Sequence, residues 1–291
     1  MIVLDGKKTA IALKEEIKLT VDKRINDGKK IPHLAAVLVG NDGASLTYVG
    51  SKVRSCEQIG IKSTLIHLED TISENELLQK ITQLNNDDSL DGYIVQLPLP
   101  KHINEEKILL AIDPRKDVDG FHPSNFGRMA LEMDSFIPAT PYGIMELLKR
   151  YKIETSGKHC VVIGRSHIVG RPISILMSQK GPYGNATVTV AHSRTENIEV
   201  LTRSADIIIS ALGIPEFLKA DMVKQDVVII DVGITRVSDT NHPKGYVIKG
   251  DVAYEEVARK AYAITPVPGG VGPMTIAMLL KNTLLACERR D

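Results

Sequence analysis

The sequence predicts a two-domain α/β protein, with an N-terminal three-layer α/β domain, a second α/β domain and a C-terminal helix that returns to the first. The chain has 291 residues, enough for two domains that each bury a core. Helical patterns alternate with β-branched runs, and such near-continuously apolar strands are typical of parallel sheets covered on both faces. The alternation restarts after "FIPATPYG", residues 136–143, where we expect the second domain to begin.

The first domain is expected to alternate helices and strands. The helices are expected at residues 9–26, 45–58 and 73–84, and the strands at residues 33–40, 61–68 and 91–100. The first helix has apolar residues at helical spacing and ends at Asp27-Gly28. Ser73 and Glu76 form a capping box that opens the third helix, and Pro98 closes the third strand.

The second domain is expected to contain strands at residues 159–164, 186–191, 206–212 and 227–233, with helical or loop segments between them. After "PVPGGVGP", residues 266–273, the sequence "MTIAMLLKNTLLAC" predicts a helix that is apolar almost all round, so we expect it to pack against the first domain. The Pro/Gly segments 138–143 and 266–273 would connect an inserted module, with the site in a cleft between the domains. We place the first domain at residues 1–142, completed by 274–291, and the second at 143–273.

Composition excludes several classes of protein. Lys plus Arg equals Asp plus Glu at 36 each, so no net field favours polyanions and nucleic acid is not an expected partner. The three cysteines lie far apart with no C-x-x-C, which argues against a disulfide framework or a zinc site. The eight histidines show no H-x-x-x-H spacing, and no metal is expected. Because no apolar run is long enough for a signal peptide or a membrane span, we expect a cytoplasmic protein with no membrane partner.

The stretch "VVIGRSHIVGRPIS" departs from the usual G-x-G-x-x-G dinucleotide loop. Gly164 follows a strand and permits a tight turn, while Gly170 and Pro172 open a helix whose first amide groups point back at the loop. These features predict an anion cradle. Arg165 and Ser166 stand where a second glycine would allow close backbone approach, and they supply a cation and a hydroxyl instead.

The strand that follows indicates which dinucleotide this loop binds. In NAD-binding units of the Rossmann type, an acid at the end of the second strand receives the ribose hydroxyls. Here that strand ends in His192, Ser193 and Arg194, with no acid. A phosphate on the adenosine ribose would suit Arg194 and the Arg165-Ser166 pair, so we predict a Rossmann-type NADP-binding domain. The loop alone also permits a strand-turn-helix with a solvated arginine.

A second group of residues lies in the first domain. Tyr48 and Lys52 are four residues apart and therefore share one face of their helix. Gln96 interrupts "YIVQLPLP" at the carboxyl end of its strand, the edge where parallel sheets place ligands. The spacing alone leaves two alternatives open, a solvated lysine and an amide that caps a loop.

The segment "KDVDGFH" invites a calcium-loop interpretation that its spacing excludes. With Gly120 as the turn glycine, the first ligand position would be Arg115 and the bidentate position Phe126. Neither side chain binds calcium. Asp119 is better interpreted as an acceptor for the N–H groups of a ligand.

Six segments in order resemble the bifunctional methylenetetrahydrofolate dehydrogenase/methenyltetrahydrofolate cyclohydrolase family. They are "YVGSKVRSCEQIGI", "DGYIVQLPLP", "KDVDGFH", "PATPYG", "VVIGRSHIVGRP" and "PVPGGVGPMTIAMLLKNT", and the match runs from near residue 30 to the end of the chain. The family often has a cysteine where this chain has Ala139 and Ala191, positions to which we assign no chemistry. The resemblance implies a folate-binding catalytic domain, an NADP-binding domain and a homodimer formed through the cofactor domains.

The resemblance also implies an activity. Members oxidise 5,10-methylenetetrahydrofolate to the 5,10-methenyl form with NADP and hydrolyse that product to 10-formyltetrahydrofolate, within one-carbon metabolism and purine biosynthesis. It places Tyr48, Lys52, Gln96 and Asp119 against the folate. Lys52 is then the candidate general base and acid, with a pKa that burial and the substrate cation should lower. Tyr48 would stack on the pterin and orient Lys52, Gln96 would polarise the substrate or hold Lys52, and Asp119 would accept from pterin N–H groups.

The remaining predicted contacts line the rest of the site. Gly213 and Ile234 follow strand ends and should line the dinucleotide, and the resemblance adds Thr275 near the nicotinamide. The other expected contacts are Leu97, Pro268 and Gly269 with the folate, and Gly164, Arg165, Ser166, Ile168, Gly170, His192, Ser193 and Arg194 with NADP. A hinge role for the glycines of "PGGVG" stays open beside ligand contact.

Two other functions remain open at this point. One is a shikimate-dehydrogenase-like NADP reductase, which shares the inserted Rossmann layout and a catalytic lysine but does not require "DVDG" or "PGGVGPMT". The other is a non-catalytic domain that senses the nicotinamide pool, for which Lys52 would be dispensable.

Overall fold

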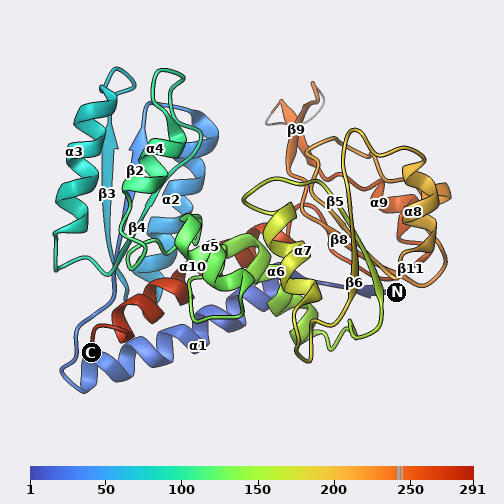
Figure 1. The fold of residues 1–291 in the computed structure, drawn as a ribbon, viewed down its shortest axis with the longest axis horizontal. Helices are drawn as coiled ribbons and strands as arrows, with labels where there is room; N and C mark the ends of the chain where they lie inside the picture. Colours follow the sequence, from blue (N-terminus) through green and yellow to red (C-terminus); the bar gives the residue numbers. More distant parts are fainter. Residues whose placement is uncertain (241–242, 244) are drawn as a thin grey trace. The chain divides into compact units, whose positions relative to one another are not determined.

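The computed structural model in Figure 1 describes residues 1–240, 243 and 245–291. In these residues the chain forms two compact units. Unit 1 comprises residues 1–10 and 140–275, and unit 2 comprises residues 11–139 and 276–291. The chain passes between the units at 139/140, inside the predicted Pro/Gly segment, and at 275/276, just beyond the other one. A third passage, at 10/11, lies within the first helix and was not foreseen.

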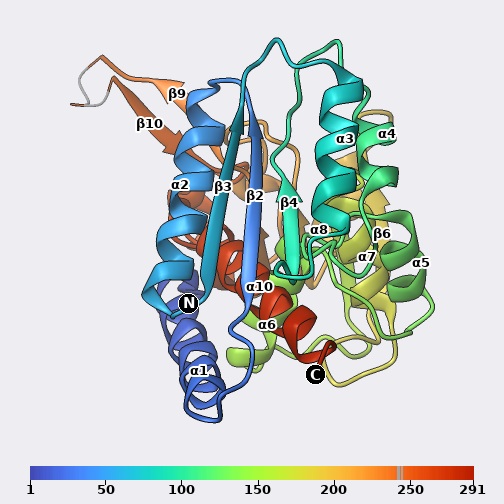
Figure 2. The ribbon, with the colours of Figure 1, turned by 90° about the vertical axis from the view of Figure 1, so that its left-hand side faces the viewer.

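The centre of unit 2 is a parallel sheet that, among the described residues, has the strand order β3-β2-β4. The strands are β2 (His33–Val39), β3 (Lys62–Leu68) and β4 (Gly92–Val95), and Figure 2 shows them side by side. Residue Ala36 of β2 is paired with Leu65 on one side and Ile94 on the other. All three strands were predicted from the sequence, and the prediction is confirmed.

Helices cover both faces of this sheet, which gives three layers. Figure 1 shows α2 (Gly43–Gln58) and α3 (Glu74–Asn85) on opposite sides of the strands. Alternate residues of β2, such as Val37, pack with Leu77 and Ile81 of α3 in one buried cluster. The predicted capping box of α3 is confirmed, since Ser73 and Glu76 bond each other's backbone N–H. The other helices of unit 2 are most of α1 (Gly6–Asn26), α4 (Glu105–Ala111), α5 (Pro123–Ala130) and most of α10 (Val271–Glu288).

Unit 1 is built on a larger parallel sheet. Over the described residues its strand order is β1-β11-β8-β7-β5-β6, and every neighbouring pair is parallel. The strands are β1 (Ile2–Val3), β5 (His159–Ile163), β6 (Thr187–Ala191), β7 (Ile207–Ser210), β8 (Val227–Asp231) and β11 (Ala261–Ile264). Strands β5, β6, β7 and β8 were predicted, but β1 and β11 were not. Because β1 pairs with β11, the first ten residues group with unit 1.

The connections of unit 1 are short helices and one hairpin. The helices are α6 (Ala139–Arg150), α7 (Gly170–Ser178), α8 (Ile198–Ser204), η1 (Ala220–Met222) and α9 (Tyr254–Val257). The hairpin pairs β9 (Thr235–Ser238) with β10 (Tyr246–Lys249) in antiparallel register. Since β5, β6, β7 and β8 run in the same direction, the loops that follow these strands all leave from one edge of the sheet.

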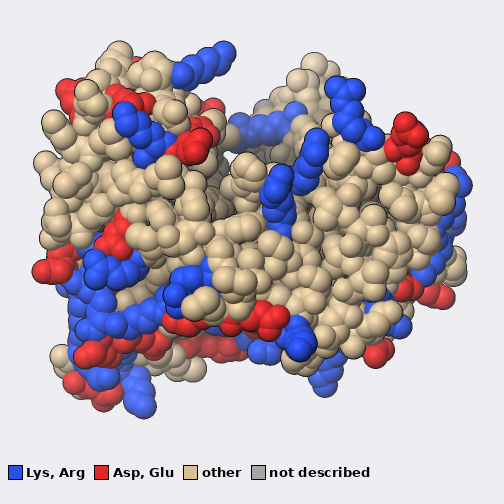
Figure 3. Space-filling view, viewed as in Figure 1, with Lys and Arg blue, Asp and Glu red and all other residues tan. Residues whose placement is uncertain are grey.

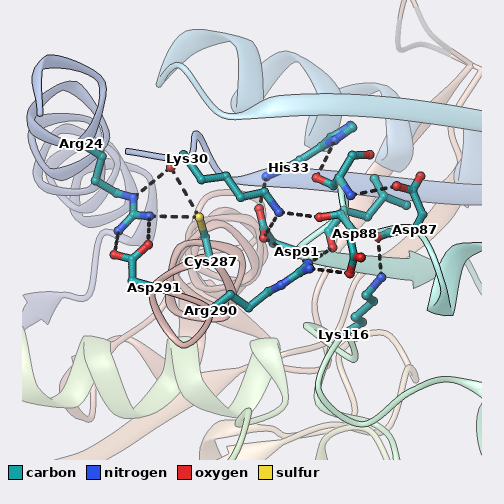
Figure 4. Close-up of polar contacts among 12 residues, drawn as sticks. Arg24, Lys30, His33, Asp87, Asp88, Asp91, Lys116, Cys287, Arg290 and Asp291 are labelled. Carbon is teal, nitrogen blue, oxygen red and sulfur yellow. Dashed lines mark hydrogen bonds and ion pairs between the residues drawn. The ribbon is translucent and has the colours of Figure 1, made fainter. Parts of the chain in front are cut away.

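The C-terminal helix α10 returns to unit 2, as predicted, from Ile276 onward. Its end is fixed by a group of charged residues that we call the C-terminal clasp: Arg24, Lys30, Asp88, Asp91, Arg290 and Asp291 (Figure 4). Arg24 makes a two-pronged bond to Asp291, with N–O distances of 2.9 and 2.8 Å. The fully buried Asp91 accepts from Lys30 Nζ at 2.6 Å and from the backbone N–H of His33 at 2.9 Å.

Charge is mixed over the molecule. Figure 3 shows basic and acidic side chains interspersed on the face that it displays, in line with the 36 residues of each sign. In the part of the chain that the structure describes, no helix is both long enough and apolar enough to cross a membrane. The same residues contain no group of three or more His, Cys, Asp or Glu side chains arranged to hold a metal ion.

Candidate active site

Helix α2 presents Lys52 to the carboxyl end of β4. The helix begins after Asp42, whose side chain accepts from the Ser45 N–H at 2.8 Å. Lys52 lies one turn after Tyr48, and its Nζ is 4.8 Å from the centroid of the Tyr48 ring. The same nitrogen donates to Gln96 Oε1 at 3.2 Å. The structure therefore brings together three of the four residues predicted to act on the folate.

Burial changes the acidity of Lys52. Only 4% of the residue is exposed, and this burial lowers the pKa of its ammonium group. The negative charge of Asp119 opposes the shift and is the largest of the opposing effects. The neutral amine is therefore more populated near neutral pH than in an exposed lysine, in the direction expected of a general base.

Gln96 is positioned by the end of its strand. Strand β4 ends at Val95, and the backbone N–H of Gln96 still donates to the carbonyl of Val37 at 2.8 Å. Its side-chain oxygen accepts from Lys52, and its side-chain nitrogen donates to the carbonyl of Leu97 at 2.7 Å. The amide thus caps a loop, as one sequence interpretation expected, and also contacts the lysine. Leu97 is half-buried and precedes a cis peptide bond to Pro98.

Asp119 lies on the loop that follows a bridge between Tyr93 and Asp117. Burial raises the pKa of Asp119, and the charge of Lys52 opposes that rise, so the two groups lie within electrostatic reach. The carboxylate of Asp117 accepts from the N–H groups of Phe121 at 3.2 Å and His122 at 2.8 Å. Burial raises the pKa of Asp117 to about 7. Sequence reasoning assigned no role to Asp117, although it is the first acid of "DVDG".

The predicted anion cradle is a closely packed turn in unit 1. Gly164 follows β5 with φ of 120°, and an added Cβ would lie 2.4 Å from the carbonyl oxygen of Ala211. At Gly170 an added Cβ would lie 2.3 Å from the carbonyl oxygen of Gly164. Both positions therefore require glycine, because a side chain at either one would collide with backbone atoms of this chain.

The serine of this loop already has partners. Ser166 Oγ accepts from the N–H groups of Val169 at 3.2 Å and Gly170 at 3.3 Å. Two of the amide groups that we expected to face an anion are thus occupied by this hydroxyl, whose own hydrogen can still be donated to a ligand. Arg165, Ser166 and Ile168 are exposed.

The loop after β6 lies beside this turn in the sheet. Strand β6 pairs with β5, and Ala191 is aligned with Ile163. His192 Nδ1 accepts from the N–H of Arg194 at 3.2 Å, while Ser193 and Arg194 are exposed. Two exposed guanidinium groups, one from Arg165 and one from Arg194, therefore leave the same edge on neighbouring strands.

A buried carboxylate shapes the next two loops. Asp251 accepts from the N–H groups of Leu212 at 2.6 Å and Ile214 at 3.0 Å, which flank the predicted contact Gly213. An added Cβ at Gly233 would lie 2.2 Å from an oxygen of Asp251, and the next residue, Ile234, is 60% exposed. Sequence reasoning missed Asp251, because its contacts come from residues distant in the chain.

The predicted residues of the "PGGVG" segment also belong to unit 1. Pro268 follows a cis peptide bond, and Gly269 has φ of 108°. The carbonyl of Gly269 accepts from the N–H of Lys7 at 2.8 Å, which ties the segment to the start of α1. Thr275 and Thr140 share a hydrogen bond of 2.9 Å between their hydroxyl oxygens.

Two family models match the chain. The model of the tetrahydrofolate dehydrogenase/cyclohydrolase catalytic domain matches residues 4–119, and the model of the NAD(P)-binding domain of the same family matches residues 138–291. The chain belongs to the tetrahydrofolate dehydrogenase/cyclohydrolase family. The predicted resemblance, the enzyme class and a nicotinamide dinucleotide cofactor are thereby confirmed.

Relatives of this family match over the whole length. The bifunctional protein FolD of Flavobacterium johnsoniae is 72% identical over 291 residues, which cover 100% of this chain and 99% of the relative. The crystal structure of the bifunctional FolD methylenetetrahydrofolate dehydrogenase/cyclohydrolase of Campylobacter jejuni is 48% identical, with a TM-score of 0.94 and 100% of both chains covered.

A third similar protein is the methylenetetrahydrofolate dehydrogenase-cyclohydrolase of Trypanosoma brucei, whose crystal structure is complexed with NADP cofactor and inhibitor. It is 35% identical with a TM-score of 0.94, and the match covers 100% of this chain and 98% of the Trypanosoma chain. These likenesses confirm the two-domain α/β fold. Membership of the tetrahydrofolate dehydrogenase/cyclohydrolase family also decides among the functions that the sequence left open, in favour of a bifunctional dehydrogenase and cyclohydrolase.

Proposed function

We propose that this enzyme oxidises 5,10-methylenetetrahydrofolate with NADP and hydrolyses the methenyl product to 10-formyltetrahydrofolate, with Lys52 as the residue that transfers protons. The observation that supports this role is a buried amine with a lowered pKa, 3.2 Å from the amide oxygen of Gln96 and 4.8 Å from the ring centroid of Tyr48. A neutral amine in this setting can accept a proton near neutral pH.

The oxidation step asks the protein for position rather than proton transfer. When bound, NADP supplies a hydride acceptor for the carbon that bridges N5 and N10 of the folate. The methenyl cation that remains is stabilised by its own two nitrogens, so no residue has to move a proton in this step. Tyr48 and Gln96 would hold the folate with its one-carbon bridge beside Lys52.

The hydrolysis step requires proton transfer in both directions. Water attacks the cationic carbon, and the neutral amine of Lys52 takes a proton from that water. The bond between the carbon and N5 then breaks as the Lys52 ammonium returns its proton to N5, and the remaining hydroxyl proton is released to solvent as the formyl C=O forms. Gln96 would keep the lysine aligned through its side-chain oxygen, and Asp119 would accept from the N–H groups of the pterin.

The NADP assignment depends on the carboxyl edge of unit 1. The turn at Gly164 leads from β5 into the amino end of α7, and the amino end of a helix favours an anion such as a diphosphate. Arg165 and Arg194 supply exposed positive charge at the ends of neighbouring strands, and Ser166 retains a donor hydrogen. Together they would hold a phosphate on the adenosine ribose. The cofactor contacts would be completed by Ile168, His192, Ser193, Gly213, Ile234 and Thr275. The folate contacts would be completed by Leu97, Pro268 and Gly269.

We further propose the domain roles and the assembly. Residues 1–142 with 274–291 would bind the folate, and residues 143–273 the cofactor. Two such chains would form a homodimer through their cofactor domains. In the sheet as described, β6 pairs only with β5, so one edge of β6 is available to a second copy.

A cytoplasmic location is supported by three cysteines that are buried as free thiols.

The role of Lys52 is tested by replacing Lys52 with methionine. Lys52→Met should lower methenyl hydrolysis by about 10²–10⁴-fold, the usual contribution of general acid–base catalysis, while the protein still folds and binds NADP. Lys14→Met is the matched control, because burial also lowers the pKa of Lys14 but its amine bonds Ser55 instead. Formation and decay of the methenyl species are followed by absorbance. Hydrolysis retained in Lys52→Met would remove this lysine from the mechanism.

The coenzyme preference is tested at the two arginines. Arg165→Ala and Arg194→Ala should each lower kcat/KM with NADP about tenfold, the value of one charge-assisted hydrogen bond, and leave kcat/KM with NAD nearly unchanged. Arg259→Ala is the control, because Arg259 is exposed at the opposite edge of the sheet, just before β11. An NADP to NAD preference that stays at the wild-type value in both variants would contradict the phosphate assignment.

A further inference from the structure

The loop that bears Asp119 is held by a side chain of the C-terminal helix. Asn282 of α10 is 1% exposed, and its amide nitrogen donates to the carbonyl of Val118 at 2.9 Å and to the carbonyl of Ile137 at 2.9 Å. Both hydrogens of one amide group are thus used, on two backbone segments distant in sequence. One of those carbonyls belongs to the residue directly before Asp119.

The same loop is fixed from two other directions. Gly120, on the far side of Asp119, has φ of 74°, and an added Cβ would lie 2.7 Å from the backbone nitrogen of Pro138. Asp117 accepts from the N–H of His122 at 2.8 Å and from the side-chain amide of Asn125 at 2.9 Å. The backbone on either side of Asp119 therefore has one arrangement that satisfies all these contacts.

We propose that Asn282 is a positioning residue that sets the place of the Asp119 carboxylate, and through it the affinity for the folate. The inference rests on the proposed function, in which Asp119 accepts from the pterin. A backbone carbonyl that loses a buried donor must turn toward another partner, because an unsatisfied buried carbonyl is costly. Rotation of the peptide after Val118 would move the backbone nitrogen of Asp119 and hence its carboxylate.

The chemistry of the side chain explains why asparagine is suited to this position. An asparagine amide offers two N–H donors on one nitrogen, which matches two carbonyl acceptors. Leucine has nearly the same size but no donor, and serine keeps a single donor. Replacement by serine therefore keeps at most one of the two hydrogen bonds. Replacement by leucine removes both, with little change in side-chain volume.

The experiment compares kinetic constants of the full chain with Asn282→Leu, Asn282→Ser and Thr283→Val. Thr283 is the matched control, because it is the next residue of α10, is equally buried and, among the described residues, donates its hydroxyl to the carbonyl of Leu279 in its own helix. KM for methylenetetrahydrofolate should rise about tenfold in Asn282→Leu, the effect of one net hydrogen bond, and by a smaller factor in Asn282→Ser. KM for NADP should stay within about twofold of the wild type in all variants.

The split between KM and kcat distinguishes positioning from simple destabilisation. A purely structural effect lowers the active fraction, and hence kcat, equally in the Asn282 variants and in Thr283→Val, and leaves the folate KM unchanged. That outcome would overturn the proposal. Should Asn282→Leu fail to fold, an unchanged folate KM in folded Asn282→Ser would overturn it as well. Wild-type protein that turns over no methylenetetrahydrofolate would instead contradict the proposed function.

Discussion

At the scale of single residues, the active-site chemistry depends on a balance between burial and one opposite charge. Burial lowers the pKa of Lys52, while the carboxylate of Asp119 raises it. Cys56 acts in the same direction as Asp119 but more weakly, and Gln96 contributes a neutral acceptor. The fraction of neutral amine is thus set by Asp119 as well as by the protein interior.

Replacement of Asp119 by asparagine should therefore shift the pH profile of hydrolysis. Asp119→Asn removes the negative charge, so the pKa of Lys52 falls further, and the neutral amine persists to lower pH. The acid limb of kcat/KM for methenyl hydrolysis should move to lower pH, and the folate KM should rise because one acceptor is lost. The profile is measured from initial rates after subtraction of the uncatalysed reaction. An acid limb that stays in place or moves to higher pH would show that Asp119 does not act on Lys52.

At the scale of elements, the C-terminal clasp joins the end of α10 to helix α1 and to the segments that precede β2 and β4 (Figure 4). Its members differ in burial. Asp91 is fully buried and accepts from Lys30 and the backbone of His33, whereas the side chain of Asp88 is 98% exposed and pairs with Arg290 at 2.9 Å. Their contributions to stability should differ accordingly, because exposed ion pairs are screened by water.

The prediction is a loss of about 2–3 kcal/mol in the free energy of unfolding for Asp91→Ala, since a buried acceptor is removed but its partially exposed lysine can still reach water. Asp88→Ala, the control in the same clasp, should cost less than about 0.5 kcal/mol. Urea unfolding followed by circular dichroism measures both values, because the chain contains no tryptophan for fluorescence. Equal losses in the two variants would mean that burial does not decide the strength of this clasp.

The elements that the sequence predicted share a clear signal, and those it missed do not. Strands such as β2, "HLAAVLV", are long and almost wholly buried, so their apolar run is visible. Strand β11, "AYAI", has four residues, and β1 has two, too few for any periodicity. The hairpin strands "TRVS" and "YVIK" have four residues each and are partly exposed. For these elements the neighbouring strands, not the local sequence, determine the structure.

At the scale of the whole molecule, the sequence predicted where the chain passes from one unit to the other better than it predicted which residues hold the loops in place. Prolines and glycines marked the passage at 139/140, but the passage inside α1 has no local signal because the helix is continuous. Asp117, Asp251 and Asn282 could not be recognised either. Each acts through buried hydrogen bonds to backbone groups that only the folded chain brings close.

Buried carboxyl groups of this kind should make global stability depend on pH. Burial raises the pKa of Asp231 to about 7, and the nearby Asp251 adds to the effect. In the unfolded chain Asp231 would have its ordinary value of 3.8. The native state therefore binds a proton that the unfolded state releases, and the stability that this group contributes is complete below the unfolded pKa and is lost as pH rises through about 7.

The variant Asp231→Asn isolates this contribution, because its amide does not titrate. The difference in unfolding free energy, wild type minus variant, should fall by about 2–3 kcal/mol between roughly pH 5 and pH 8, at about 1.36 kcal/mol for each pKa unit crossed. Glu255→Gln, an exposed acid of α9 in the same unit, is the control and should leave the difference from the wild type flat over this range. Urea titrations at several pH values give the slope. A difference that stays flat between pH 5 and pH 8 would mean that the three N–H donors from Gly233, Asp251 and Val252 hold Asp231 ionised in the native state, so that hydrogen bonding and not burial governs this carboxyl group.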